Sequence, residues 1–254
     1  METVSHHGRT IAYRESDRGG GGSPVLFVHG SGGSSGVWRS QFRLADERPV
    51  VALDLSGHGE SDDFQAEPGY ETLCAYVDDV VTVAEETDAR AVVGNSLGGA
   101  VAMLGVLERD FEPDELVLAG TGAKLAVLDD LLAWLDDDFD RAVDFLHEPD
   151  RLFHDPDERY VTVSKNAMYE TGQTVTRRDF RSVHEFDERD RLDEITPRSL
   201  ALVGEHDQLT PPHYHEYLAE HVPDCELAVV EDAAHLSMLE RPEAFNAALA
   251  AFLD

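Results

Sequence analysis

The sequence predicts an α/β fold, with a mostly parallel sheet, helices on both faces and one helical insertion. Six short apolar runs alternate with helix-like stretches along most of the chain, and one amphipathic segment interrupts this alternation. Short, continuous apolar runs are typical of parallel strands that are buried on both faces. The 254 residues suffice for a single domain with one insertion.

The expected elements follow one another in a simple order. Residues 9–16 alternate apolar and polar side chains, which predicts an antiparallel edge strand, and the GGGGS run at 19–23 predicts a turn rather than a linker. The six buried strands are expected at VLFVHG (25–30), VVALDL (50–55), AVVGNS (91–96), LVLAG (116–120), LALVGE (200–205) and LAVVED (227–232). Helices are expected at 97–107 and at 242–253, where the second opens on a proline suited to a first helical turn. Active sites of such sheets lie at the carboxyl ends of the strands.

The segment from residue 121 to residue 195 contains no strand-like run of comparable strength. Its apolar side chains recur at spacings of three and four residues, as on one face of a helix: Leu125, Leu128, Leu132, Leu135, Phe139, Val143 and Leu146. We therefore expect residues 1–120 and 196–254 to form the core, and residues 121–195 to form a helical cap over the site. Candidate pocket walls within the cap are Met168, Tyr169, Phe180 and Phe186.

The charge balance restricts the possible partners. The chain has 52 acidic and 20 basic residues, a formal net charge of −32, and its only lysines are Lys124 and Lys165. Such a field repels phosphate backbones and anionic membranes, so neither is expected as a partner. The composition resembles that of cytosolic proteins from extreme halophiles, whose surfaces gather cations and water. We expect a cytoplasmic protein, since no signal sequence and no membrane-length apolar run is apparent.

The stretch Gly94-Asn95-Ser96-Leu97-Gly98 is a G-x-S-x-G between an expected strand and an expected helix. Glycines two residues before and after the serine allow a turn tight enough to bring the two backbones together. The turn holds the Ser96 hydroxyl above the sheet, near the amino end of the next helix, where backbone N–H groups favour developing negative charge. This placement predicts that Ser96 is a nucleophile.

A serine nucleophile needs a base and an acid that orients the base. Asp207 comes just after one expected strand and His235 just after the next, so both should lie at the same sheet edge as Ser96. Glu205 comes too early along the chain to be the acid, and Asp232 is too near His235.

No metal site is expected. In particular, His213 and His215 stand two residues apart, which does not suit one helix face.

These features resemble the α/β-hydrolase fold superfamily, and in particular its serine-nucleophile, small-carboxylesterase-like branch. The likeness covers essentially the whole chain and includes FVHGSGGSSGVW, LDLSGHGESD and HLSMLERPEAFN. It implies that the backbone N–H groups of Ser31 and Leu97 form an oxyanion hole. It also implies that His29 and His58 are framework residues. Dehalogenases and epoxide hydrolases of the superfamily carry an aspartate where this chain has Ser96, so those chemistries are disfavoured.

The function implied is acyl transfer to water through Ser96, His235 and Asp207, with no cofactor. Small esters are the expected substrates. Relatives with the same residues also hydrolyse carbon–carbon bonds, lactones, thioesters or N-terminal prolyl peptides, or act as perhydrolases, and the sequence leaves these alternatives open. A ligand-binding receptor on the same scaffold is a more remote alternative. The oligomeric state is also left open.

Overall fold

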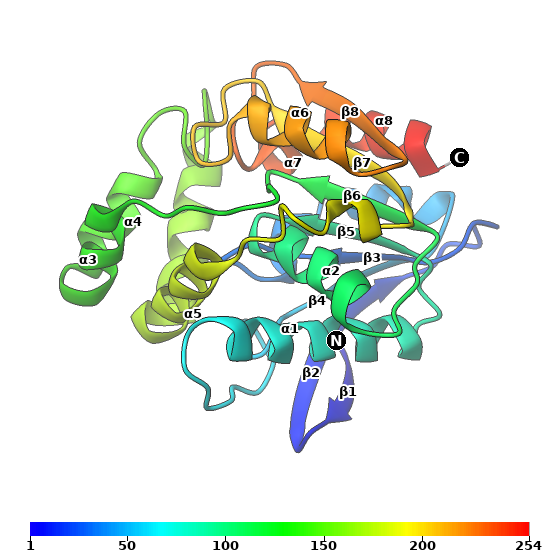
Figure 1. Cartoon of the computed structure of the whole chain (residues 1–254), viewed down its shortest axis with the longest axis horizontal. Helices are drawn as coiled ribbons and strands as arrows, with labels where there is room; N and C mark the ends of the chain where they lie inside the picture. Colours follow the sequence, from blue (N-terminus) through cyan, green and yellow to red (C-terminus); the bar gives the residue numbers. More distant parts are fainter. Residues whose placement is uncertain (254) are drawn as a thin grey trace.

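The computed structural model describes residues 1–253, which form an eight-stranded sheet with helices on both faces (Figure 1). The strands lie in the order β1-β2-β4-β3-β5-β6-β7-β8. Their bounds are β1 Glu2–His6, β2 Arg9–Ser16, β3 Val25–Val28, β4 Val50–Leu53, β5 Ala91–Asn95, β6 Glu115–Ala119, β7 Arg198–Gly204 and β8 Cys225–Val230. Strands β3 to β8 are parallel to one another, and β1 and β2 pair antiparallel at one end. The predicted fold class is confirmed.

Successive side chains of the central strands enter two separate apolar layers. In β3, Leu26 and Val28 join the layer beneath α1 (Tyr70–Glu86), α2 (Leu97–Glu108) and α6 (Pro212–His221). Val25 and Phe27 join the opposite layer, with α8 (Pro242–Leu253) and the short helices η1 (Ser35–Trp38), η2 (Gln41–Asp46) and α7 (Ser237–Glu240). Figure 1 shows α1, α2 and α6 in front of the sheet and α8 behind it. Burial on both faces explains why successive residues of these strands are apolar, apart from a few polar residues at the strand ends.

Residues 121–195, between β6 and β7, leave the sheet and form helices. These are α3 (Asp129–Asp137), α4 (Phe139–Leu146), α5 (Glu158–Glu185) and the short η3 (Leu192–Glu194). Figure 1 shows α3, α4 and α5 gathered to the left of the sheet. Helix α5 is interrupted at Gly172, whose φ of 81° and ψ of 163° are not helical. We call residues 121–195 the insertion.

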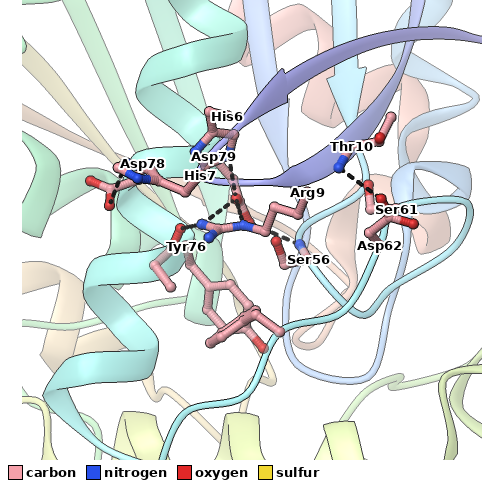
Figure 2. Close-up of polar contacts among 12 residues, drawn as sticks. His6, His7, Arg9, Thr10, Ser56, Ser61, Asp62, Tyr76, Asp78 and Asp79 are labelled. Atoms are coloured by element: carbon pink, nitrogen blue, oxygen red, sulfur yellow. Dashed lines mark hydrogen bonds and ion pairs between the residues drawn. The ribbon is translucent and has the colours of Figure 1, made fainter.

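A buried carboxylate ties the N-terminal hairpin to the rest of the core (Figure 2). Asp79 of α1 is fully buried and accepts hydrogen bonds from His6 Nε2 at 2.8 Å and Arg9 Nη2 at 2.9 Å. The backbone N–H of Ser56 donates to its second oxygen at 2.9 Å. A buried carboxylate is costly unless it is paired in this way. Strands β1 and β2 are therefore fixed by polar contacts to α1 as well as by the sheet.

Two expectations about the sheet edges were wrong. Strand β2 is an inner strand, because β1 pairs along its outer side. The sequence of β1, ETVSH, contains one apolar residue and gave no strand signal. At the other end, β8 is the edge rather than a strand buried on both faces, and it leaves Leu227 and Val229 exposed. Among residues 1–253, none of the helices combines the length and apolarity needed to span a membrane.

Candidate active site

Ser96 occupies a strained corner between β5 and α2. Its φ of 54° and ψ of −116° lie in a region that residues other than glycine rarely adopt. A side chain on Gly94 would come within 2.3 Å of the Gly98 carbonyl oxygen, and one on Gly98 within 2.4 Å of the Val28 carbonyl oxygen. Both glycines are therefore required by close backbone approach. This is the geometry that the G-x-S-x-G spacing predicts.

Asp207 and His235 form a buried hydrogen-bonded pair beyond the ends of β7 and β8. The Asp207 Oδ2 lies 2.8 Å from His235 Nδ1. Asp207 is held in turn by the backbone N–H groups of Leu209 and Thr210, at 2.8 and 2.9 Å, and by the Thr210 hydroxyl at 2.8 Å. Asp207 accepts a hydrogen bond from the Nδ1–H of His235. The neutral ring therefore has its free lone pair on Nε2.

Ser96 and His235 line the same cavity, which has a volume of about 1150 Å³. The insertion supplies most of its apolar lining: Leu125, Val127, Leu128, Leu131, Phe145, Leu152, Tyr160, Val163, Met168, Phe180 and Val183. Core loops add Val37, Phe42, Leu209, Leu236 and Leu239. A large apolar pocket with a few polar groups is typical of small-molecule sites. The insertion thus forms much of the wall around Ser96.

The loop after β3 packs directly against Ser96. A side chain on Gly30 would come within 3.2 Å of the Ser96 Cβ, a tight contact that a glycine avoids. Ser31 lines the cavity, whereas the Leu97 side chain is fully buried in the core. Within residues 1–253, the backbone N–H of Ser31 has no hydrogen-bond acceptor, and that of Leu97 is at the first turn of α2, where helical N–H groups lack partners. Both amides thus have no acceptor of their own among the described residues.

The insertion reaches this loop through Asp179, a residue that the sequence analysis missed. Asp179 lies on α5, is fully buried, and accepts a hydrogen bond from the backbone N–H of Gly32 at 3.0 Å. It also accepts from His58 Nε2 at 2.9 Å and from the Tyr76 hydroxyl at 2.7 Å. Asp179 therefore joins the insertion, helix α1 and the loop beside Ser96 at one point.

The two framework histidines carry different charges. The Leu55 N–H donates to His29 Nε2, and His29 Nδ1 donates to the Gly30 carbonyl, which requires a neutral ring. Burial and the neighbouring His58 charge lower the pKa of His29 to about 4. His58 donates from both nitrogens, to Asp179 and to the Ser56 carbonyl. Burial alone lowers the pKa of His58, but the Asp179 carboxylate more than offsets this effect and raises it.

Two of the four candidate pocket walls were wrong. Met168 and Phe180 line the cavity. Tyr169 is 44% exposed, outside the cavity, and packs edge-on against Phe139. Phe186 is buried in the core layer beneath α1 and α2 and lies beyond the end of α5. Helical periodicity indicates which side chains share a face, but it does not indicate whether that face meets the cavity or the core.

Among the described residues, the rejected candidates make no hydrogen bond or ion pair with His235. Glu205 accepts from the Asp232 backbone N–H at 3.2 Å on the exposed side of these loops. His213 is exposed, whereas His215 is fully buried and accepts from the Thr121 backbone N–H at 3.0 Å. Burial lowers the pKa of His215 to about 4, which keeps its ring neutral.

Clusters of possible metal ligands occur elsewhere among the described residues, and the sequence analysis missed them. Asp150, His154 and His206 form one group, and Glu205, His206 and Asp232 form another. The only sequence pattern that could have indicated metal ligands was the i, i+4 spacing of Asp150 and His154.

Comparison with known proteins places the chain among hydrolases. The sequence profile described as "Alpha/beta hydrolase family" matches residues 25–248. A curated relative from Caulobacter vibrioides, "Putative carbamate hydrolase RutD", is 31% identical over 98% of this chain and 93% of its own length. A thermophilic esterase of solved structure is 30% identical, with a TM-score of 0.85 over 99% of this chain and 96% of that one. Est816, described as an N-acyl homoserine lactone degrading enzyme, is 26% identical, with a TM-score of 0.85 over 99% and 100%.

Proposed function

Because this chain belongs to the alpha/beta hydrolase family and is an esterase-like enzyme, we propose that it hydrolyses small carboxylic esters through Ser96, His235 and Asp207. The observation that carries the proposal is the shared cavity. It exposes a strained serine and a histidine whose Nδ1 is bound by a buried aspartate. A nucleophile, a base and an orienting acid around one pocket are what acyl transfer requires.

In the proposed mechanism, His235 Nε2 accepts the Ser96 proton as the hydroxyl oxygen attacks the ester carbonyl. The carbonyl oxygen becomes an oxyanion, which the backbone N–H groups of Ser31 and Leu97 stabilise. His235 then protonates the departing alcohol, and an acyl-enzyme remains on Ser96. Water, deprotonated by the same histidine, releases the acid and restores the serine. Asp207 orients the ring and stabilises its positive charge during both steps.

The cavity lining favours substrates with apolar acyl or alcohol groups. Most of the lining side chains contributed by the insertion are aliphatic or aromatic. The net charge of −32 repels strongly anionic substrates as they approach. We therefore propose neutral esters of short to medium chain length as the substrate class.

A lactone is the second candidate, favoured by the full-length likeness to Est816. A lactone is an internal ester, so its opening uses the same steps and leaves the alcohol attached to the acid. A carbamate, which the name of the Caulobacter relative suggests, would also react at its carbonyl. The two alternatives differ from simple esters in pocket fit rather than in catalytic groups.

The test combines labelling with a substrate panel. We expect a fluorophosphonate to label Ser96 alone, and Ser96→Ala to fold normally while losing roughly four to six orders of magnitude in kcat/KM. p-Nitrophenyl esters of increasing chain length, N-acyl homoserine lactones and a carbamate would rank the substrate classes. Full activity in Ser96→Ala, with circular dichroism unchanged, would overturn the mechanism. Higher kcat/KM on lactones would make the second candidate the function.

A further inference from the structure

Three side chains from two separate parts of the chain meet beside the acid loop. Asp150 and His154 belong to the insertion, in the turn between α4 and α5, and His206 directly precedes Asp207. One donor atom from each lies within 4.8 Å of the other two. The rings of His154 and His206 stack with their centroids 3.7 Å apart, and His154 Nδ1 is hydrogen-bonded to Asp150 Oδ1. All three side chains are half-buried.

We propose that Asp150, His154 and His206 bind a divalent transition-metal ion of the Zn²⁺ type. Two imidazoles and a carboxylate are a donor set that suits Zn²⁺, Co²⁺ or Ni²⁺ better than Mg²⁺ or Ca²⁺, which prefer oxygen ligands alone. In a tetrahedral Zn²⁺ site the ligand atoms are about 3.4 Å apart, as bond lengths of about 2.1 Å require. The rings of His154 and His206, which stack in the chain without an ion, turn on binding so that one nitrogen of each points at the ion.

The backbone that carries these ligands is fixed by contacts outside the group. The side chain of Glu240 accepts from the backbone N–H groups of His154, Asp155 and Ala234. The Gln208 N–H donates to the Asp150 carbonyl at 2.9 Å, and the His206 N–H donates to the Ala233 carbonyl at 2.9 Å. The ligand positions therefore exist before an ion arrives, which reduces the entropic cost of binding.

The surroundings favour a cation and could complete the coordination. Glu205 and Asp232 each offer a carboxylate oxygen within 4.8 Å of a ring nitrogen of His206. These carboxylates add negative charge beside the three proposed ligands, which favours a cation.

The consequence of binding is a bridge between the insertion and the loop of Asp207. Asp150 and His154 belong to the insertion, while His206 belongs to the loop that positions the proposed catalytic acid. An ion held by all three ligands would stabilise the folded chain, because the unfolded chain lacks the site. This role does not depend on the proposed function, since it is measured by binding and unfolding alone.

The experiment is a titration of EDTA-treated, full-length protein with Zn²⁺ in about 1 M KCl, where nonspecific attraction to the acidic surface is screened. Calorimetry should give one ion per chain. The melting temperature should rise by about 5 °C when the free Zn²⁺ concentration is about a hundred times Kd. His206→Ala and His154→Ala should each weaken binding by roughly tenfold or more. Mg²⁺ at the same concentration should produce no comparable shift.

The matched control is His7→Ala, which removes an exposed histidine beside Asp78 at the opposite end of the sheet (Figure 2). It should bind Zn²⁺ like the wild type. Asp150→Asn provides a second test should either histidine variant fail to fold, as judged by circular dichroism without metal. Absence of Zn²⁺ binding would overturn the proposal. Equal affinity in wild type and His206→Ala, or an equal effect of Mg²⁺, would also overturn it.

Discussion

The protein contains two buried histidine–aspartate pairs that look alike by distance. His235 and Asp207 are joined at 2.8 Å, and His58 and Asp179 at 2.9 Å. In each pair both side chains are buried, and the aspartate accepts further hydrogen bonds from backbone or hydroxyl groups. Distance and burial alone do not distinguish a site of chemistry from a structural contact.

The two pairs differ in the second nitrogen of the histidine. His58 donates from both nitrogens, to Asp179 and to the Ser56 carbonyl, and has no accessible surface. His235 uses Nδ1 for Asp207 and lines the cavity that also exposes Ser96. A base must have a free lone pair that reaches the reacting group. We infer that His235 serves chemistry and that His58 holds the insertion against the core.

The largest expected effect separates the two histidines. His235→Gln should lower kcat/KM by roughly four to six orders of magnitude, because no other group would accept the Ser96 proton. His58→Gln should lower it by no more than roughly tenfold, through a less well-held loop. Ester hydrolysis assays on the two purified variants make the comparison. Equal losses in both variants would erase the distinction between the pairs.

The next effect separates Asp179 from another buried carboxylate, Asp79, which also lies on a helix. Asp179→Ala should lower kcat by roughly ten- to a hundredfold, with a smaller change in KM, because Gly32 loses its acceptor and the loop beside Ser96 shifts. Asp179→Asn, which keeps an acceptor, should recover part of that loss. Both alanine variants, Asp179→Ala and Asp79→Ala, should lose about 3 to 5 kcal/mol of unfolding free energy, since each leaves a buried charge unpaired. Urea unfolding measures this loss of unfolding free energy.

Asp79→Ala is the matched control for that experiment. Its carboxylate binds His6, Arg9 and the Ser56 N–H (Figure 2) and makes no hydrogen bond to the loop beside Ser96. Its kcat should stay within about threefold of the wild type, because the loss is one of stability alone. If Asp79→Ala lowered kcat as much as Asp179→Ala, the positioning role of Asp179 would reduce to general destabilisation.

A change of pH is expected to have a smaller effect, on the unfolding free energy contributed by His58 and Asp179. The pKa of His58 is raised in the folded protein, so its contribution to stability is complete below its ordinary pKa of 6.5 and is lost as the pH rises through the raised value. Burial raises the pKa of Asp179, but His58 more than offsets this and lowers it, so the Asp179 contribution is lost only as the pH falls through that lowered value. The difference in unfolding free energy between wild type and His58→Gln should therefore shrink from about pH 6 to pH 9. A difference that grew over this range would contradict the charged state of His58.

Salt should weaken the repulsion between surface carboxylates but should leave the stability contributed by the buried pairs unchanged. The net charge of −32 makes the carboxylates repel one another, and the Debye length falls from about 10 Å at 0.1 M salt to about 3 Å at 1 M. The melting temperature of the wild type should therefore rise with KCl. The loss caused by Asp179→Ala should change by less than about 0.5 kcal/mol over the same range, because buried charges are screened little. Thermal melts of both proteins in a KCl series test both statements.

The sequence predicted what depends on short-range pattern. Continuous apolar runs indicated the parallel strands, and a polar residue just beyond such runs indicated Ser96, Asp207 and His235 as neighbours. The structure brings Asp207 and His235 into contact and places Ser96 and His235 at one cavity. Their catalytic roles remain predictions for the experiments above. Strand β1 escaped prediction because Val4 is the only apolar residue in ETVSH.

The remaining contacts depend on how the insertion packs, which local pattern does not specify. Asp179 lies in a helix rich in charged residues, and nothing nearby in the sequence marks it as buried. Its partners Gly32, His58 and Tyr76 are more than a hundred residues away along the chain. The Asp150, His154 and His206 group likewise joins two loops. Such clusters become visible only when tertiary packing is known.

The break in α5 at Gly172 divides the helix into parts with different freedom to evolve. The part before it carries Tyr160, Val163 and Met168 into the cavity wall, and the part after it adds Phe180 to that wall but also carries Asp179 into the core. With φ at 81° and ψ at 163°, Gly172 ends one helical hydrogen-bond ladder and begins another. Substitutions at Tyr160 or Val163 can therefore alter which molecules fit while the hydrogen bond from the Gly32 N–H to Asp179, on the far side of the break, is kept.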